Sequence, residues 1–301
     1  MNIKRIFHLT IRFIVGLFFI TSGSLKLISI DSFEIYIYSF GIFNLKLSFL
    51  FARFIISLEL LSGILITIGF FLKKTTFYSI ILLSFFSIFI AYLYLSNNEE
   101  HCHCFGDIIE LSLSFSFIKN IILLVLLIII NKNHEINMKF KKLVLITSTI
   151  VSISLPLILS PPDFFFYNKY SKGIDYNDLL LDEFLTNNNQ YKKGKQILSF
   201  YGTSCKFCKL ASQKISVIAN KAERNEMFSN IFWGTEDAIQ TFFETTKSTK
   251  FNYSSLKADK FLRITNGKMP LIICIDNGVV KAKYGYRNIN ENEFMAFINS
   301  K

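Results

Sequence analysis

The sequence has 301 residues, of which 51% are hydrophobic and 18% are charged, with a formal net charge of +11 and a mean hydropathy of +0.39. The apolar residues concentrate in the first half, in runs that a single water-soluble domain would not carry. No basic cluster is interleaved with aromatic residues, which argues against nucleic acid as a partner.

Five apolar runs follow one another along the chain, each close to the roughly 20 residues that a helix needs to cross a bilayer. They are residues 9–28, 48–72, 76–96, 113–130 and 143–160. Lys4 and Arg5 precede the first run, as in a signal peptide, but the length of the run and the spans behind it favour a retained helix. The sequence therefore predicts a multi-pass membrane protein in contact with the lipid bilayer.

Basic residues between the runs indicate the orientation. They lie in alternate connections: Lys4 and Arg5; Lys73 and Lys74; Lys132, Lys139, Lys141 and Lys142. The connection over residues 97–110 carries acidic residues and no Lys or Arg. By the positive-inside rule the amino terminus is cytoplasmic, and residues from about 161 onward lie outside, with the aromatic run 164–167 as an anchor at the outer surface.

Polar and small residues inside the runs predict contacts between helices. Glu59 lies near the middle of the second run, where a bare carboxylate is costly, so we expect it to face the bundle interior. Its expected partners are Arg12 and Lys119, in a structural ion pair or a proton relay. Close helix contact is expected at Gly16, Ser22, Gly23, Ser24 and Gly63.

A group of reactive residues lies in the acidic outer connection over residues 97–110: His101, Cys102, His103 and Cys104. A Cys-x-Cys disulfide closes a small ring, and strained or exposed disulfides are the labile ones, which favours a redox exchange partner. Two alternatives stay open. The four side chains could bind zinc or copper, or the two cysteines could form a static surface disulfide.

Cys205 and Cys208 form a Cys-x-x-Cys pair between a predicted strand, residues 196–201, and a predicted helix, residues 210–222. Unpaired N–H groups and the dipole at the helix start favour a thiolate at Cys205, while Cys208, one turn further, is the predicted resolving thiol. We expect Thr203 or Ser204 to cap this helix.

The alternatives for this pair are a zinc half-site and a structural disulfide. A zinc site needs more ligands, and the soluble part of the sequence offers only Cys274 and no histidine. A redox dithiol is therefore favoured. Cys274 itself falls in an apolar predicted strand, residues 271–275, and is interpreted as an inert core residue.

The order of strand, Cys-x-x-Cys, helix, Met269-Pro270, hairpin and final helix (residues 291–298) resembles a thioredoxin-like domain. The resemblance implies a cis Pro270 beside the dithiol, shaping the substrate site. Lys206 and Phe207 stand between the cysteines where reducing thioredoxins have Gly-Pro, so the direction of electron flow stays open.

The membrane half resembles the DoxX/MauE-like family over about residues 6–131. The residues that carry this resemblance are Arg12 to Gly16, Ser22 to Leu27, Glu59 with Gly63, Cys102 to Gly106, and Lys119 with Asn120. Members of the MauE type are implicated in maturing a disulfide-rich periplasmic subunit, and their four-helix unit is similar to the DsbB and vitamin K epoxide reductase group. The resemblance implies a bacterial inner-membrane protein, with a quinone as an implied cofactor.

Together these features predict an α-helical membrane bundle followed by an α/β thioredoxin-like domain. The predicted boundaries are 1–131 for the four-helix domain, 132–160 for a cytoplasmic loop and fifth span, 161–194 for a linker and 195–301 for the thioredoxin-like domain. The predicted function is thiol–disulfide exchange between the two cysteine pairs and an extracytoplasmic client protein. The alternatives are a membrane assembly or maturation factor or an oxidase-associated subunit, in each case without redox turnover of its own, and metal handling through residues 101–104.

Overall fold

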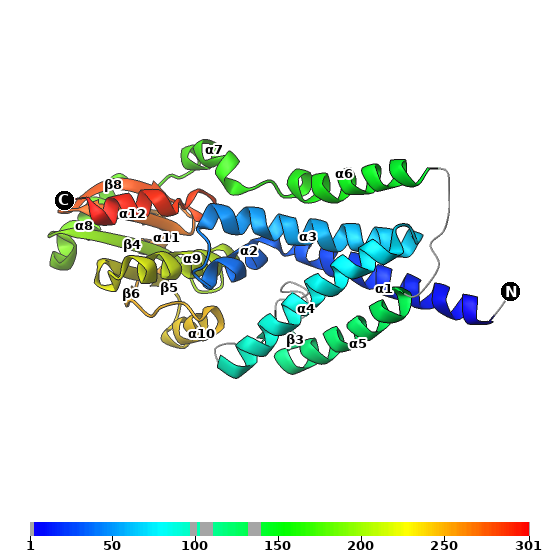
Figure 1. Cartoon of the computed structure of the whole chain (residues 1–301). Helices are drawn as coiled ribbons and strands as arrows, with labels where there is room; N and C mark the ends of the chain where they lie inside the picture. Colours follow the sequence, from blue (N-terminus) through cyan, green and yellow to red (C-terminus); the bar gives the residue numbers. More distant parts are fainter. Residues whose placement is uncertain (1–2, 97–100, 103–110, 132–139, 301) are drawn as a thin grey trace. The chain divides into compact units, whose positions relative to one another are not determined.

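The computed structural model describes residues 3–96, 101–102, 111–131 and 140–300. The chain forms two compact units. The first comprises residues 1–36 and 49–161, and the second comprises residues 37–48 and 162–301. Figure 1 labels the elements and colours them along the sequence.

Within the described ranges, five helices are long and apolar enough to cross a membrane, so the predicted multi-pass arrangement is confirmed. They are α1 (Ile3–Ile28), α3 (Leu45–Ile68), α4 (Leu72–Ser96), α5 (Leu113–Asn131) and α6 (Lys141–Leu159). A shorter helix that the sequence analysis did not predict, α2 (Ile30–Ser39), follows α1.

The break between the second and third spans lies earlier than predicted. The apolar run was expected to continue to residue 72, but α3 ends at Ile68 and α4 begins at Leu72. Gly69 and Phe71 adopt positive φ angles of 87° and 50°, which end the first helix and turn the chain into the next. Hydropathy alone does not reveal this turn, because Phe70, Phe71 and Leu72 are as apolar as the spans.

Glycines bring α1 and α3 together, as predicted. A Cβ on Gly16 would lie 2.9 Å from the carbonyl oxygen of Gly63, and one on Gly63 would lie 2.8 Å from that of Gly16. Further along, Gly23 faces Leu60 and Glu59. The two backbones therefore touch in an antiparallel register that larger residues at these positions would prevent.

Helix α5 packs along α4 and also contacts α1. Between α4 and α5, β1 (His101–Cys102) pairs antiparallel with β3 (Leu111–Ser112), with Cys102 opposite Leu111. His103 and Cys104 lie outside the described residues.

The second unit is built on a mixed sheet of order β6-β5-β4-β7-β8. Its strands are β4 (Lys195–Gly202), β5 (Phe228–Trp233), β6 (Asn252–Ser255), β7 (Leu271–Asp276) and β8 (Val279–Tyr284). β6, β5 and β4 run parallel to one another, whereas β7 is antiparallel to β4 and β8 is antiparallel to β7. β4 lies at the centre, and its last six residues are buried, as expected for a strand covered on both faces.

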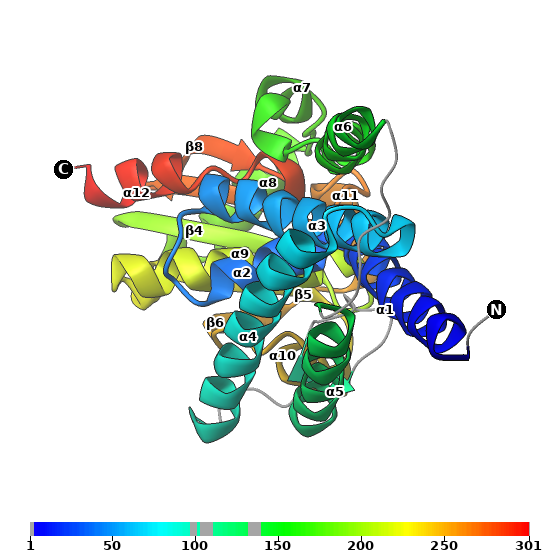
Figure 2. The same ribbon diagram turned by 45° about the vertical axis from the view of Figure 1, so that its right-hand side comes forward.

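Helices cover both faces of this sheet (Figure 2). The helices of residues 162–301 are α7 (Tyr167–Lys172), α8 (Asp178–Asn187), α9 (Lys206–Ala222), α10 (Glu236–Thr246), α11 (Ala258–Ile264) and α12 (Glu291–Asn299), with short 3-10 turns η1 (Asp163–Phe165), η2 (Asn189–Tyr191), η3 (Asn225–Met227) and η4 (Tyr286–Asn288).

Alternating residues of β4 fill the two cores. Leu198 and Phe200 pack in one cluster with Phe184 of α8 and Phe261 of α11. Tyr201 points to the other face, where its ring stacks on Phe242 of α10 at 5.9 Å, and α9 contacts β4, α10 and α12. This α/β arrangement, with the dithiol between the central strand and the first helix after it, confirms the predicted thioredoxin-like fold.

Candidate functional site

The turn that carries the thiols is held at both ends by backbone hydrogen bonds. β4 ends at Gly202 and α9 begins at Lys206. The N–H of Cys205 donates to the carbonyl of Gly202 (3.1 Å), and the N–H of Thr203 donates to the carbonyl of Trp233 on β5 (3.1 Å). The position of Cys205 is therefore set by the sheet as well as by the helix that it starts.

The helix cap differs from the prediction. Neither Thr203 nor Ser204 caps α9; Cys205 does, with its Sγ accepting a hydrogen bond from the N–H of Cys208 at 3.2 Å. Thr203 donates its side-chain hydroxyl instead to the Trp233 carbonyl at 3.4 Å. The reactive atom thus occupies the place of the usual capping oxygen, where the free N–H groups stabilise negative charge.

This arrangement lowers the pKa of Cys205 to about 7. The hydrogen bond from the Cys208 thiol is the largest cause, partial burial opposes it, and the backbone N–H groups of Cys208 and Phe207 add to it. At neutral pH about half of Cys205 is then thiolate, the form that attacks disulfides.

Cys208 has the opposite environment. Its side chain is fully buried, and burial, followed by the hydrogen bond to Cys205, raises its pKa. Both cysteines are free thiols in the structure. The pair therefore consists of one partly exposed, acidic thiol and one buried, protonated thiol, a division suited to attack followed by resolution.

The Met269–Pro270 bond is cis, as the thioredoxin-like resemblance implies. The Met269 side chain lies close to Cys205, because a Cβ placed on Gly202 would be 2.7 Å from the Met269 sulfur and 3.6 Å from Cβ of Cys205. A side chain at position 202 would thus collide with Met269. Phe207 and Trp233 are 41% and 37% exposed and give the surface near Cys205 an apolar character.

Buried charges that the sequence analysis missed lie in the same unit. Asp163, just after α6, is buried and binds Arg287 at 2.8 Å and Lys214 of α9 at 3.8 Å. The Arg287 guanidinium also lies 5.8 Å from the ring of Phe207, the residue just before Cys208 in the sequence. No local signal predicts this cluster, because its members come from three separate segments.

The remaining cysteine is buried as expected. Cys274 lies within β7 with no exposed surface, and burial raises its pKa to about 12. Among the residues that the structure describes, no group of three His, Cys, Asp or Glu side chains is arranged to hold a metal ion. Of the residues in the alternative metal site, His103 and Cys104 lie outside the described part of the chain.

The sequence analysis did not name the residue that forms the closest ion pair with Glu59. Glu59 binds Lys26 of α1, with 2.7 and 2.8 Å between Lys26 Nζ and the two carboxylate oxygens. The antiparallel register explains the difference. It places Arg12 beside Gly69, at the end of α3, and brings Lys26 opposite Glu59.

Comparison with known proteins gives matches for both parts of the chain. Residues 4–131, which end with α5, match the family described as methylamine utilisation protein MauE. Over 95% of its length the chain is 26% identical to Protein TlpB of Flavobacterium psychrophilum, 92% of which is covered.

Two solved structures are similar to part of the chain. The thioredoxin domain of a thiol-disulfide oxidoreductase from Bacteroides vulgatus is 21% identical, with a TM-score of 0.31 over 37% of this chain and 84% of that one. A thiol:disulfide interchange protein from a Bacteroides species is 20% identical, also with a TM-score of 0.31, over 37% of this chain and 78% of that one.

Proposed function

Because residues 4–131 are a MauE-family domain and the second unit carries an activated dithiol, we propose that the chain is a membrane thiol–disulfide oxidoreductase. The observation that carries the proposal is the contrast between Cys205 and Cys208. One thiol is partly exposed with a lowered pKa, and its neighbour is fully buried with a raised pKa. A purely structural pair has no need of this difference.

In the proposed reaction, the Cys205 thiolate attacks a disulfide of a client protein. The client S–S bond breaks, one client sulfur leaves as a thiolate, and a Cys205–client disulfide forms. Cys208 then loses its proton and attacks Sγ of Cys205, which releases the second client thiolate and leaves a Cys205–Cys208 disulfide. Two electrons pass to the client, and the reverse sequence oxidises it.

Pro270 and Met269 belong to the proposed client site. The Met269 side chain, from the segment before β7, lies against Gly202 beside Cys205, so we propose that an extended client segment lies along this stretch while its sulfur reaches Cys205. Exposed Phe207 and Trp233 offer apolar contacts to the residues that flank the client cysteine.

The renewal of the dithiol is proposed to depend on Cys102 and Cys104. Exchange with the outer pair would return Cys205 and Cys208 to their starting state after each turnover. Both pairs are proposed to face the outside of a bacterial inner membrane, with the amino terminus in the cytoplasm, on the strength of the alternating basic connections. The oxidising compartment there allows disulfides to form and exchange.

The relay is tested by trapping. In isolated membranes, Cys104→Ser with Cys208→Ser removes both candidate resolving thiols and is expected to accumulate a disulfide between Cys102 and Cys205, detected by a mobility shift that a reductant reverses. Cys104→Ser with Cys274→Ser is the matched control, since buried Cys274 takes no part. If no link between residues 102 and 205 forms under oxidising conditions, the relay is wrong and an assembly role takes its place.

A further inference from the structure

Arg12 is a charged residue within a membrane span that the thiol chemistry described above does not use. It lies on α1, six residues after Ile6, where the first span begins. Its Nε is buried and has no hydrogen-bond partner in the described part of the chain. Ionisable residues within spans are costly, are almost always paired and mark functional sites by default. The partner of this guanidinium therefore needs to be identified.

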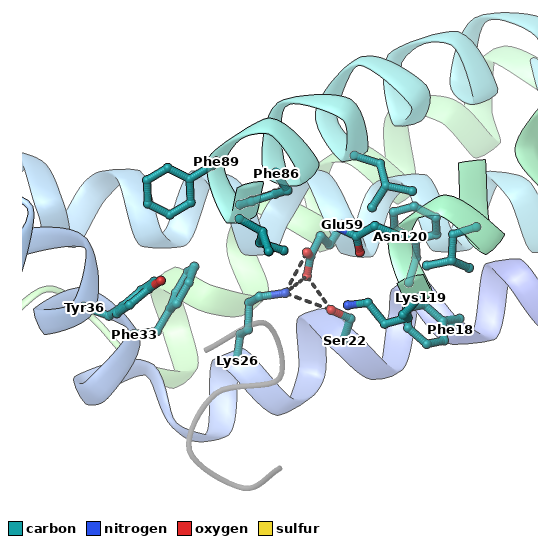
Figure 3. A pocket seen from close by; sticks show the side chains of 14 residues that line it. Phe18, Ser22, Lys26, Phe33, Tyr36, Glu59, Phe86, Phe89, Lys119 and Asn120 are labelled. Atoms are coloured by element: carbon teal, nitrogen blue, oxygen red, sulfur yellow. Dashed lines mark hydrogen bonds and ion pairs between the residues drawn. The ribbon is translucent and has the colours of Figure 1, made fainter. Parts of the chain in front are cut away.

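Other charges in the helical unit are paired within the chain. Lys26 and Glu59 bind each other, as Figure 3 shows. Arg53 donates to the carboxylate of Glu34 and, through its Nε at 2.9 Å, to the carbonyl of Ser160. Because a buried ion without a partner is strongly destabilising, we expect the guanidinium on α1 to be paired as well, by a group from outside the described chain.

The Arg12 guanidinium lies against the turn between α3 and α4. A Cβ placed on Gly69 would collide with it, at 2.7 Å from Arg12 Cζ. Gly69 directly follows Ile68, the last residue of the second span, so the long side chain carries its charge to the level where that span ends. Lys73 and Lys74, exposed at the start of α4, add positive charge after the same turn. Clustered basic residues at the end of a span attract anionic lipid headgroups.

An open groove is lined by Arg12 and its neighbours on α1. Its volume is about 350 Å³, within the roughly 300–1,000 Å³ range of small-molecule sites. Leu9, Phe13 and Ile14 belong to the lining and are 38%, 53% and 57% exposed. Exposed apolar side chains on a membrane span face the lipid. The groove therefore offers a cation and an apolar wall to molecules of the bilayer.

Two threonines complete the lining of the groove, Thr10 and Thr67. The Thr10 hydroxyl donates to the carbonyl of Ile6 at 3.1 Å, and the Thr67 hydroxyl donates to the carbonyl of Gly63 at 2.7 Å. A hydroxyl has one proton to donate and two lone pairs that accept. With their protons used inside the helices, both oxygens can only accept from a ligand, which suits a ligand that carries hydroxyl groups.

We propose that this groove binds an anionic glycerophospholipid of the bilayer, with the lipid phosphate paired to the Arg12 guanidinium. The planar guanidinium fork matches two oxygens of a phosphate. Acyl carbons cover Phe13 and Ile14, and headgroup hydroxyls such as those of phosphatidylglycerol donate to the threonine oxygens. A free phosphate ion has the same charge but leaves the apolar wall uncovered. Phosphatidylcholine has no headgroup donor and brings a second positive charge beside Arg12.

The test uses the purified full-length chain in detergent and native mass spectrometry, which counts bound lipids. Titration with dioleoyl-phosphatidylglycerol is expected to fill a saturable site, and dioleoyl-phosphatidylcholine, with the same acyl chains, should bind more weakly. Arg12→Gln is expected to weaken phosphatidylglycerol binding about tenfold, the usual effect of losing one hydrogen-bonded charge. Inorganic phosphate, added as a competitor, should not displace the lipid.

Lys142→Gln is the matched control. Lys142 is exposed at the start of α6 and does not line the groove, so its loss removes one positive charge without changing the site. Its affinity for phosphatidylglycerol should equal that of wild type. Arg12→Lys keeps the charge but loses the fork, so its affinity should lie between those of wild type and Arg12→Gln. If Arg12→Gln fails to fold, the comparison of Arg12→Lys with wild type carries the test.

Three results would overturn the lipid site. Equal affinity of wild type and the Arg12 variants for phosphatidylglycerol would show that interfacial water satisfies the guanidinium. Equal affinity for the two lipids would show that the apolar wall alone attracts them. Displacement by inorganic phosphate would assign the groove to a free anion. Each of these results leaves the proposed oxidoreductase untouched, because the thiol reaction uses none of the groove residues.

Discussion

Two polar sites in the described part of this molecule, the thiol site and the Lys26–Glu59 pair, are built in opposite ways. The thiol site is made within one turn of chain, where Cys205 caps the helix that also holds Cys208. The Lys26–Glu59 site in the helical unit joins residues from α1 and α3 that are 33 positions apart. In the first, a hydrogen bond from the Cys208 thiol and then backbone N–H groups stabilise the Cys205 thiolate; in the second, two buried side-chain charges pair with each other. A local site should therefore tolerate changes in packing that a long-range site does not.

The largest expected effect is at Cys205. Cys205→Ser should reduce disulfide exchange with a model client disulfide to the uncatalysed rate, because among Cys205, Cys208 and Cys274 only Cys205 has a lowered pKa. The measurement is the rate of client reduction by the purified chain. Cys274→Ser is the control and should keep the wild-type rate. Residual catalysis by Cys205→Ser would show that another residue attacks the client disulfide.

The buried pair comes next. Glu59→Ala leaves the Lys26 charge without its partner and should destabilise the helical unit by about 3–5 kcal/mol, as for other broken buried pairs. Denaturant titration in detergent measures this. Lys26→Met with Glu59→Leu should recover most of the loss, since no charge is then left unpaired. If Glu59→Ala is as stable as wild type, the assignment of a buried Lys26–Glu59 ion pair is contradicted.

The pH dependence of Cys205 alkylation is a smaller and graded effect. Since the pKa of Cys205 is about 7, its alkylation rate should rise with pH and level off above that value, with roughly a hundredfold increase between pH 5 and pH 8. Cys208 should stay unmodified over this range because burial raises its pKa. Mass spectrometry of the alkylated peptides follows both thiols. A midpoint near 9 for Cys205 would show that neither the Cys208 thiol nor the helix start stabilises its thiolate.

The smallest effect concerns the close contact of α1 and α3. Gly16→Ala should destabilise the helical unit by about 1–3 kcal/mol, because the added methyl group meets Thr67 and the Gly63 backbone. Gly173→Ala is the control, since the nearest atom there is 3.5 Å away. Equal melting curves for the two variants would mean that the helices separate readily.

These contrasts also explain what the sequence could predict. Cys205 and Cys208 were found because a strand, a turn and a helix follow one another within a short stretch of chain. The cap was assigned wrongly because Thr203 and Ser204 have the usual capping side chains, whereas a cysteine sulfur rarely fills that place. Pro270 was recognised only through its order relative to the dithiol.

Contacts between distant segments were harder to predict. Glu59 was expected to face the interior, but the choice among Arg12, Lys26 and Lys119 depends on the register of α1 against α3, which two glycines set. Asp163 was passed over for a similar reason, since its partners Lys214 and Arg287 lie far along the chain. Periodicity indicates which face is buried, not which residue lies opposite.

The most direct test of the proposed relay is the redox state of Cys205 and Cys208 in cells that produce the chain with and without the outer pair. Acid quenching followed by a mass-tagged alkylating reagent counts free thiols. With Cys102→Ser and Cys104→Ser, the relay predicts that Cys205 and Cys208 shift to a single redox state, fully reduced or fully oxidised. The reason is that exchange with the outer pair no longer returns them to their starting state. If Cys205 and Cys208 keep the wild-type ratio of thiol to disulfide, the relay is contradicted.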